Sequence, residues 1–158
     1  MKRCLILVLL ASLMAIPTHA RLGDTLNELK KRYGKPESEP KKNESPATWL
    51  LEGEEGQLIY TVTFDAKGRS IGEGMRPLRY AKFSPAIAQS FIAMQLTAYL
   101  ESKTMRNVKP GEEYKFGGKN YTVAANETVI VDEANDFLIV WTQGPTPSVM
   151  AVRQAMMQ

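Results

Sequence analysis

The chain has 158 residues, of which 44% are hydrophobic and 23% charged, and its net charge is +3. Its length is that of a single domain, because domains typically run ~100–200 residues. With 11 Gly, 9 Pro and one Cys, the composition excludes collagen-like, low-complexity and disulfide-dense proteins.

The first twenty residues predict a secretory signal peptide. A basic start, Met1-Lys2-Arg3, precedes the uncharged run Cys4–Ile16. Pro17 and the small residues Thr18 and Ala20 follow, which is typical of a cleavage site after Ala20. The apolar run is shorter than the ~20 residues that a bilayer requires. The alternative is an uncleaved N-terminal anchor; a lipoprotein is disfavoured because Cys4 precedes the apolar run.

Removing residues 1–20 leaves 138 residues with a net charge of +1 and neither Cys nor His. This nearly neutral chain lacks the basic surface that nucleic acid requires, so we expect no nucleic-acid partner. Without Cys and His, the chain cannot form a Ser-His-Asp triad, a Cys nucleophile or a Cys/His zinc site. We predict no cofactor and no metal. An exported domain without disulfides favours a bacterial envelope protein, either periplasmic or secreted.

A short helix is predicted directly after the cleavage site. Leu22, Leu26, Leu29 and Tyr33 form one apolar stripe. Thr25 and Glu28 have the spacing of a capping box, and Gly34 with Pro36 ends the helix. Residues 37–46, ESEPKKNESP, contain no large apolar side chain and predict a solvated, mobile loop.

Three strands are expected next, at Ala47–Glu52, Gln57–Phe64 and Arg69–Met75. The second of them alternates cleanly, with Leu58, Tyr60, Val62 and Phe64 on one face.

A second helix is expected to start at Ser84-Pro85, within the uncharged segment Phe83–Leu100. This segment invites a membrane interpretation, but the proline at its start and the polar residues within it favour a central helix buried on most sides. We therefore predict no membrane span after signal cleavage.

The last third of the chain predicts a loop, three strands and a helix. The loop is 102–111, and the strands are Glu113–Phe116, 119–131 and Phe137–Thr142. Phe137–Trp141 is apolar on both faces, which indicates a central strand. A final helix is expected from Thr146-Pro147, with Val149, Val152 and Met156 aligned. The expected fold is one α+β domain over 21–158 in the order α-βββ-α-βββ-α, with two similar halves and helices against one face of an antiparallel sheet.

The acidic residues suggest a site only weakly. Three acids lie within Asp132–Asp136, but the spacing of a calcium loop is absent, and a hairpin turn explains the cluster better. The adjacent pairs Glu54-Glu55 and Glu112-Glu113 point to opposite faces if they lie on strands, so neither pair forms an acid/base dyad. We assign no catalytic residue.

Four residues are candidates for binding. Trp49, like Trp141, is expected to pack in the core, with an exposed aromatic anchor as the alternative. Arg76, Arg79 and Tyr80 precede the second helix and could hold an anion, although a solvated connector explains them more simply.

The segments Leu22–Leu29 and Arg32–Pro36 are similar to the G-x-T-x-x-E … G-x-P opening of small bacterial envelope proteins. These include the SmpA/OmlA (BamE-like) lipoproteins and the β-lactamase-inhibitor-protein fold, which pack helices on an antiparallel meander. The opening of the mature chain also resembles that of short secreted proteins of unassigned function. The resemblance covers about fifteen residues, and the acylated Cys of the lipoproteins is lacking. It implies a non-catalytic envelope binding module and supplies no site residues.

Three functional hypotheses follow. The first is an exported module that binds another envelope protein or component. The second is a small hydrolase whose carboxylate or Ser/Lys groups are brought together only by the fold. The third is membrane insertion through Phe83–Leu100.

Overall fold

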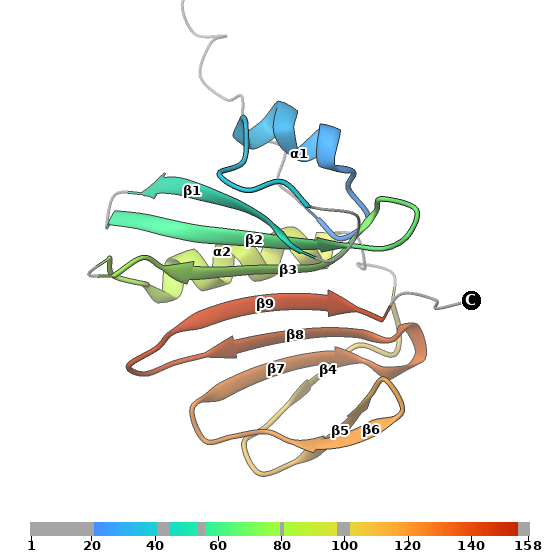
Figure 1. Cartoon of the computed structure of the whole chain (residues 1–158). Helices are drawn as coiled ribbons and strands as arrows, with labels where there is room; N and C mark the ends of the chain where they lie inside the picture. The colour runs from blue at the N-terminus through green and yellow to red at the C-terminus, as the bar shows by residue number, and fades with distance from the viewer. Residues whose placement is uncertain (1–20, 41–44, 54–55, 80, 98–101, 155–158) are drawn as a thin grey trace, which may run out of the picture.

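The computed structural model describes residues 21–40, 45–53, 56–79, 81–97 and 102–154, and these residues form nine strands and two short α-helices (Figure 1). Seven strands build one antiparallel sheet. Its spatial order is β1 (Ala47–Gly53), β2 (Gly56–Phe64), β3 (Ser70–Pro77), β9 (Ser148–Arg153), β8 (Phe137–Thr142), β7 (Glu127–Asp132) and β4 (Arg106–Val108). A separate hairpin pairs β5 (Glu113–Phe116) with β6 (Lys119–Thr122).

The fold is mostly β, so the expected α-βββ-α-βββ-α arrangement is wrong. The predicted last helix is strand β9, and it occupies the middle of the sheet between β3 and β8. Val149 and Ala151 are buried on one face, whereas Met150 and Val152 point to the other. This two-residue alternation is that of a strand, and it outweighs the three-residue spacing of Val149 and Val152 that suggested a helix.

The strands of the C-terminal part also differ from expectation. The predicted loop 102–111 contains the edge strand β4. The predicted long strand 119–131 is divided at residues 123–126, so β6 belongs to the hairpin and β7 to the main sheet. Because β9 joins β3 to β8, one continuous sheet replaces the two similar halves. The expectation that Phe137–Trp141 is central is confirmed, since β8 pairs on both sides.

Helix α1 (Leu26–Tyr33) begins after the predicted cap Thr25 and ends at the predicted Gly34, whereas Leu22 of the predicted stripe lies in a turn before the helix. The capping box is formed: the Glu28 amide donates to Thr25 Oγ1 at 3.3 Å, and the Thr25 amide donates to Glu28 Oε2 at 2.7 Å. Gly34 ends the helix with a positive φ of 79° and donates its N–H to the Lys30 carbonyl at 2.9 Å.

Helix α2 (Pro85–Leu96) is shorter and more exposed than predicted. Ser84 is its N-cap residue and Pro85 its first residue, as expected. Only Ala88, Phe91 and Gln95 are fully buried, so the helix covers the sheet with one side rather than being buried on most sides. Among the described residues, no helix has the length and apolar character needed to cross a membrane.

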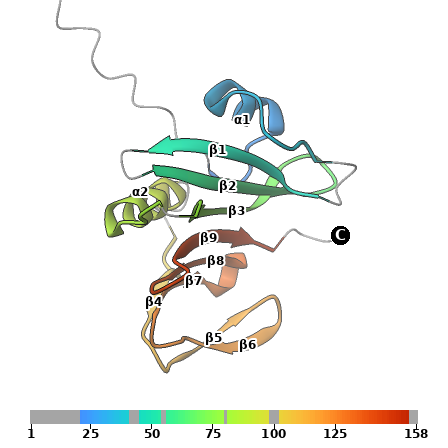
Figure 2. The same ribbon diagram turned by 60° about the vertical axis from the view of Figure 1, so that its left-hand side comes forward.

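Both helices pack on one face of the sheet, and the β5–β6 hairpin lies against the other (Figure 2). On the helix side, Leu29 of α1 and Phe91 of α2 join inward residues of five strands in the main core. On the opposite face, Tyr114 of β5 packs with Val129, Val131 and Leu138 in a smaller core. The central strands are therefore covered from two sides by different elements.

The segment that follows α1 protects the exposed edge of β1. The Glu37 amide donates to the Thr48 carbonyl at 2.8 Å, and the Thr48 amide donates to Ser38 at 3.1 Å. Buried Pro36 lies beside this contact and offers no N–H. The predicted loop 37–46 thus begins with a β-bridge, while its residues 41–44 lie outside the described residues. This arrangement blocks strand addition at the start of β1.

Candidate functional site

An apolar groove lies between α2 and the first three strands, and we call it the α2 groove. Its volume is about 510 Å³, within the ~300–1,000 Å³ typical of ligand pockets. Helix α1 contributes one lining residue, strands β1–β3 four, and α2 with its N-cap six. The lining residues are Tyr33, Leu51, Gly53, Leu58, Met75, Ser84, Ala86, Ile87, Ser90, Phe91 and Met94.

Helical periodicity explains how α2 contributes to the groove. Ile87, Ser90, Phe91 and Met94 follow the i, i+3, i+4, i+7 spacing and so lie on one side of the helix. Ile87, Phe91 and Met94 are the large apolar residues of this side, and of these three only Phe91 is fully buried. Small residues, Ala86 and Ser90, stand where larger side chains would fill the opening. The groove is therefore a product of residue size along the helix.

The chemistry of the lining is that of a binding surface. Tyr33 is the one titratable side chain among the described lining residues, and the remaining polar groups are the hydroxyls of Ser84 and Ser90. Among the described lining residues there is no pair of carboxylates and no Ser/Lys pair, whereas general acid/base chemistry needs positioned titratable groups.

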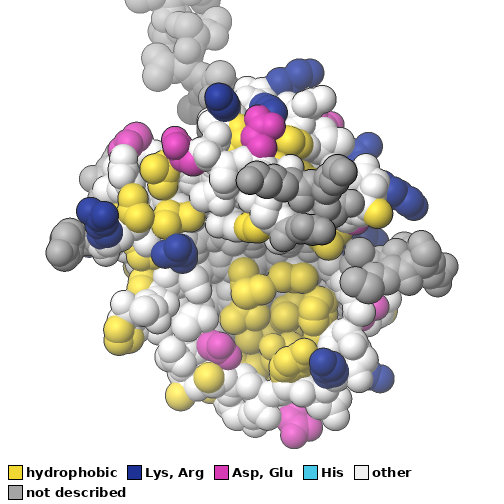
Figure 3. All heavy atoms as spheres, viewed as in Figure 1, with side chains coloured by type: hydrophobic (Ala, Val, Ile, Leu, Met, Phe, Trp, Pro, Cys, Tyr) yellow, Lys and Arg dark blue, Asp and Glu magenta, His cyan; other side chains and the backbone are white. Residues whose placement is uncertain are grey.

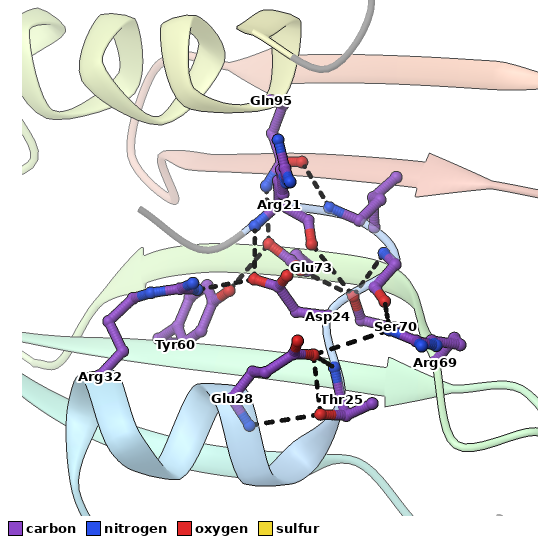
Figure 4. A network of polar contacts seen from close by, with 12 residues as sticks. Arg21, Asp24, Thr25, Glu28, Arg32, Tyr60, Arg69, Ser70, Glu73 and Gln95 are labelled. Atoms are coloured by element: carbon purple, nitrogen blue, oxygen red, sulfur yellow. Dashed lines mark hydrogen bonds and ion pairs between the residues drawn. The ribbon is translucent and has the colours of Figure 1, made fainter. Parts of the chain in front are cut away.

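The principal buried polar group of the helix side, Glu73, belongs to a network beside the groove (Figure 4). Its carboxylate is 2% exposed. It accepts hydrogen bonds from Tyr60 Oη at 2.8 Å, Gln95 Nε2 at 2.6 Å and Ser70 Oγ at 2.9 Å. Burial raises the pKa of Glu73, and these hydrogen bonds offset part of the increase. The network joins β2, β3 and α2 across the core.

The same network holds the first described residues. Ser70 Oγ accepts the Gly23 amide at 2.9 Å, and Gln95 Oε1 accepts the Leu22 amide at 3.1 Å. Asp24 pairs with Arg32 at 2.6 Å, and both side chains are largely buried. The sequence analysis did not single out Glu73. Its position two residues before Met75 in a predicted strand places both side chains on the same face, and this spacing could have indicated a buried acid.

The acidic cluster Asp132–Asp136 forms a turn in which the carboxylates of Asp132 and Glu133 have partners. Asp132 accepts hydrogen bonds from Ser102, Thr104 and Asn135. Burial alone would raise the pKa of Asp132, but these hydrogen bonds outweigh it and lower the pKa. Glu133 pairs with Arg106 at 2.7 Å. Over the described part of the chain, no group of three or more His, Cys, Asp or Glu side chains could hold a metal ion.

The two tryptophans contribute to the core. Trp49 is 2% exposed, and its indole N–H donates to the Gly34 carbonyl at 3.0 Å. Its ring lies 6.3 Å from that of Tyr33 and 5.9 Å from that of Tyr60. Trp141 is half-buried against the same core. Trp49 therefore anchors α1 to the sheet and offers no exposed ring to a partner.

Of the three residues predicted to hold an anion, the structure describes Arg76 and Arg79. Arg76 is exposed and follows inward-facing Met75, so it points to the sheet face opposite α2. Arg79 is exposed in the connector, with a φ of 51°. Tyr80 and the pair Glu54-Glu55 lie outside the described residues. The anion site stays a prediction without support from this geometry.

A second apolar surface lies on the face opposite α2, where Figure 3 shows hydrophobic side chains gathered over the central strands. Met150 is 41% exposed and pairs with Val140, and half-buried Val152 pairs with Leu138. On the other side of β9, the register places Gly72 opposite Val152 and Gly74 opposite Met150. The surface is therefore flat along β3 and apolar along β9 and β8.

Comparison with known proteins gives no family assignment. No protein-family model matches the chain, and no curated protein matches it. A cysteine-rich secretory protein from Staphylococcus aureus is similar in structure, with a TM-score of 0.46 and 14% sequence identity. The match covers 85% of this chain and 45% of that protein, so the chain spans less than half of its length.

Proposed function

We propose that this chain is an exported, non-catalytic binding module of the bacterial envelope, and that the α2 groove is its ligand site. The observation that carries the proposal is the groove itself, an apolar concavity of about 510 Å³ that stays open in a folded domain. Open apolar concavities of this size are a feature of ligand sites. The predicted signal peptide and the opening motif that resembles envelope proteins support the assignment to the envelope.

The lining favours a ligand with an unbranched apolar chain. Leu51, Leu58 and Ile87 offer aliphatic contact, and Phe91 adds an aromatic face. Met75 and Met94 carry flexible thioether side chains, which adapt to ligands of varying shape. An alkyl chain buries apolar surface at ~25 cal/mol per Å² without requiring a polar partner from the protein.

The hydrolase hypothesis has less support from the site. It requires at least two titratable side chains that converge in a concavity, and the described lining provides Tyr33 alone. Glu73 is buried and has a raised pKa, as catalytic acids often have. Both of its carboxylate oxygens, however, accept hydrogen bonds from Tyr60, Gln95 and Ser70. A binding role needs none of these groups to be free.

The test compares two substitutions on adjacent residues of α2. Ser90→Trp places a large ring in the opening of the groove, whereas Gln89→Trp places it on the exposed side of the helix outside the lining. We expect the wild type and Q89W to enhance the fluorescence of the uncharged probe N-phenyl-1-naphthylamine, and decanoic acid but not butyric acid to displace it. S90W should weaken probe binding at least tenfold, because it occupies the site.

Equal probe binding by S90W and Q89W would refute the α2 groove as the site. Both proteins should keep the wild-type melting temperature within about 3 °C, since each substitution adds its ring at an exposed position. Thermal unfolding followed by circular dichroism checks this requirement.

A further inference from the structure

The first described residue, Arg21, places its backbone nitrogen on a buried acid. This nitrogen lies 3.2 Å from Asp24 Oδ2 and donates a hydrogen bond to it (Figure 4). The side chain of Asp24 is only 12% exposed. The predicted cleavage after Ala20 would convert this same nitrogen from an amide into the α-amino group of the chain.

The backbone amides that follow are held as firmly. The Leu22 amide donates to Gln95 Oε1 at 3.1 Å, and the Gly23 amide donates to Ser70 Oγ at 2.9 Å. The side chain of Leu22 is buried in the main core. The second and third of these successive backbone nitrogens are thus received by side chains of α2 and β3, which fixes the position of the first one beside Asp24.

We infer that Asp24 is a receptor for the α-ammonium group that processing creates at Arg21. Hydrolysis of the Ala20–Arg21 peptide bond by a signal-removing peptidase consumes one water, leaves a carboxylate on Ala20 and frees an amine on Arg21. The amine takes up a proton at neutral pH, since the pKa of an α-amino group is ~7.7–8.0. The neutral amide donor at Asp24 then becomes a charged donor, and charge-assisted hydrogen bonds are about twice as strong as neutral ones.

Asp24 would then contact two cations. Arg32 Nη1 already contacts Asp24 Oδ2 at 2.6 Å, and Arg32 Nε is buried without a hydrogen-bond partner. The other titratable groups that face this region are Glu28 of α1, Tyr60 of β2, Glu73 of β3 and Arg69 of the turn before β3. Arg32 and Arg69 pair with Asp24 and Glu28, the Arg21 side chain adds a further cation, and burial raises the pKa of Glu73, so Asp24 is the carboxylate that the ammonium contacts directly.

The consequence is that processing stabilises the folded protein. A precursor, or any form with extra residues before Arg21, keeps only the neutral hydrogen bond. The processed chain gains a charged contact that anchors Arg21–Gly23, and with them the start of α1. The inference rests on cleavage after Ala20, which is part of the proposed export, but the stability effect can be measured without a cell.

The experiment uses residues 21–158 with three N-termini: free Arg21, N-acetylated Arg21, and one additional glycine before Arg21. We expect the free form to melt about 2–5 °C above the other two at pH 6. The advantage should disappear as the pH rises through the pKa of the α-amino group in the folded protein, because the contact with Asp24 raises that pKa above its value in the unfolded chain.

Two backgrounds assign the effect to Asp24. In Asp24→Asn the difference between free and acetylated forms should vanish, whereas in Arg32→Gln it should persist, because R32Q removes the other cation and keeps the acid. Equal melting temperatures for the free and acetylated wild-type forms, or a difference that survives in D24N, would overturn the inference. Mass spectrometry of the protein recovered from the periplasm or medium tests the cleavage position separately, so failure of the export proposal is distinguished from failure of the contact.

Discussion

At the scale of single residues, the most informative side chain is Glu73. A buried carboxylate costs free energy unless hydrogen bonds compensate it. Glu73 Oε2 accepts from both Tyr60 and Gln95, and Oε1 contacts Ser70 Oγ. Burial raises the pKa of Glu73 from its ordinary value of 4.5, so the folded protein binds this proton more tightly than the unfolded chain.

The sign of this shift gives a pH-dependent prediction. The contribution of Glu73 to stability is fully present below its pKa in the unfolded chain and is lost as the pH rises through its higher pKa in the folded protein. Glu73→Gln mimics the protonated acid, since its carbonyl can accept from Tyr60 and Gln95 while its amide donates to Ser70. We expect E73Q to match the wild type at pH 4 and to unfold at higher urea concentration at pH 8.

Glu73→Leu provides the control for that prediction. It removes the carboxylate that accepts from the Tyr60 hydroxyl and from Gln95 Nε2, and losing the partner of a buried polar group costs ~1–3 kcal/mol at any pH. Urea denaturation at pH 4 and pH 8 separates the two variants. A wild type that is more stable than E73Q at pH 8 would contradict the raised pKa of Glu73.

Single residues also show which structural roles can be predicted from the sequence. Trp49 was expected in the core because large apolar side chains on strands are usually buried, and it is 2% exposed. The role of Glu73 could not be predicted in the same way. Its hydrogen-bond partners are residues 60, 70 and 95. No local sequence pattern predicts that these residues are in contact with Glu73.

At the scale of elements, α1 is defined by local chemistry and was predicted correctly. Its capping box satisfies amides that would otherwise lack partners. Thr25→Ala removes the acceptor of the Glu28 amide, and we expect a loss of ~1 kcal/mol in the free energy of unfolding. Asn27→Ala, at an exposed position of the same helix, should be neutral or slightly stabilising. Similar losses for both variants in chemical denaturation would argue against the cap.

Strand β9 shows why other elements escaped prediction. Its sequence, SVMAVR, is short and follows two prolines, so its local pattern resembles the start of a helix. Its strand conformation is decided by pairing with β3 and β8, whose residues lie about 75 and 10 positions earlier in the chain. The short edge strand β4 was missed for the same reason, since it is defined by pairing with β7.

At the scale of the whole molecule, β9 is the element that unites the sheet. Without it, β3 and β8 each present an unpaired edge, and the main core loses Val149 and Ala151. We expect a fragment of residues 21–145 to lack a cooperative thermal transition. A synthetic peptide of residues 146–158 should restore the transition when it is added to the fragment.

A peptide of the same composition in scrambled order is the control. It keeps the hydrophobicity of residues 146–158 but loses the alternation that places Val149 and Ala151 on the buried face. Circular dichroism during heating provides the measurement. A fragment that melts at the temperature of the intact chain would show that β9 is dispensable for the fold.

The position of β9 also sets the order in which the sheet can be completed. The strand that closes the sheet is the last described element along the chain, so β3 and β8 can acquire their shared neighbour only after that final strand has been made. For the export that we propose, this order would keep an unfinished chain without its central strand pairing, which is the state that a translocation channel for unfolded chains requires.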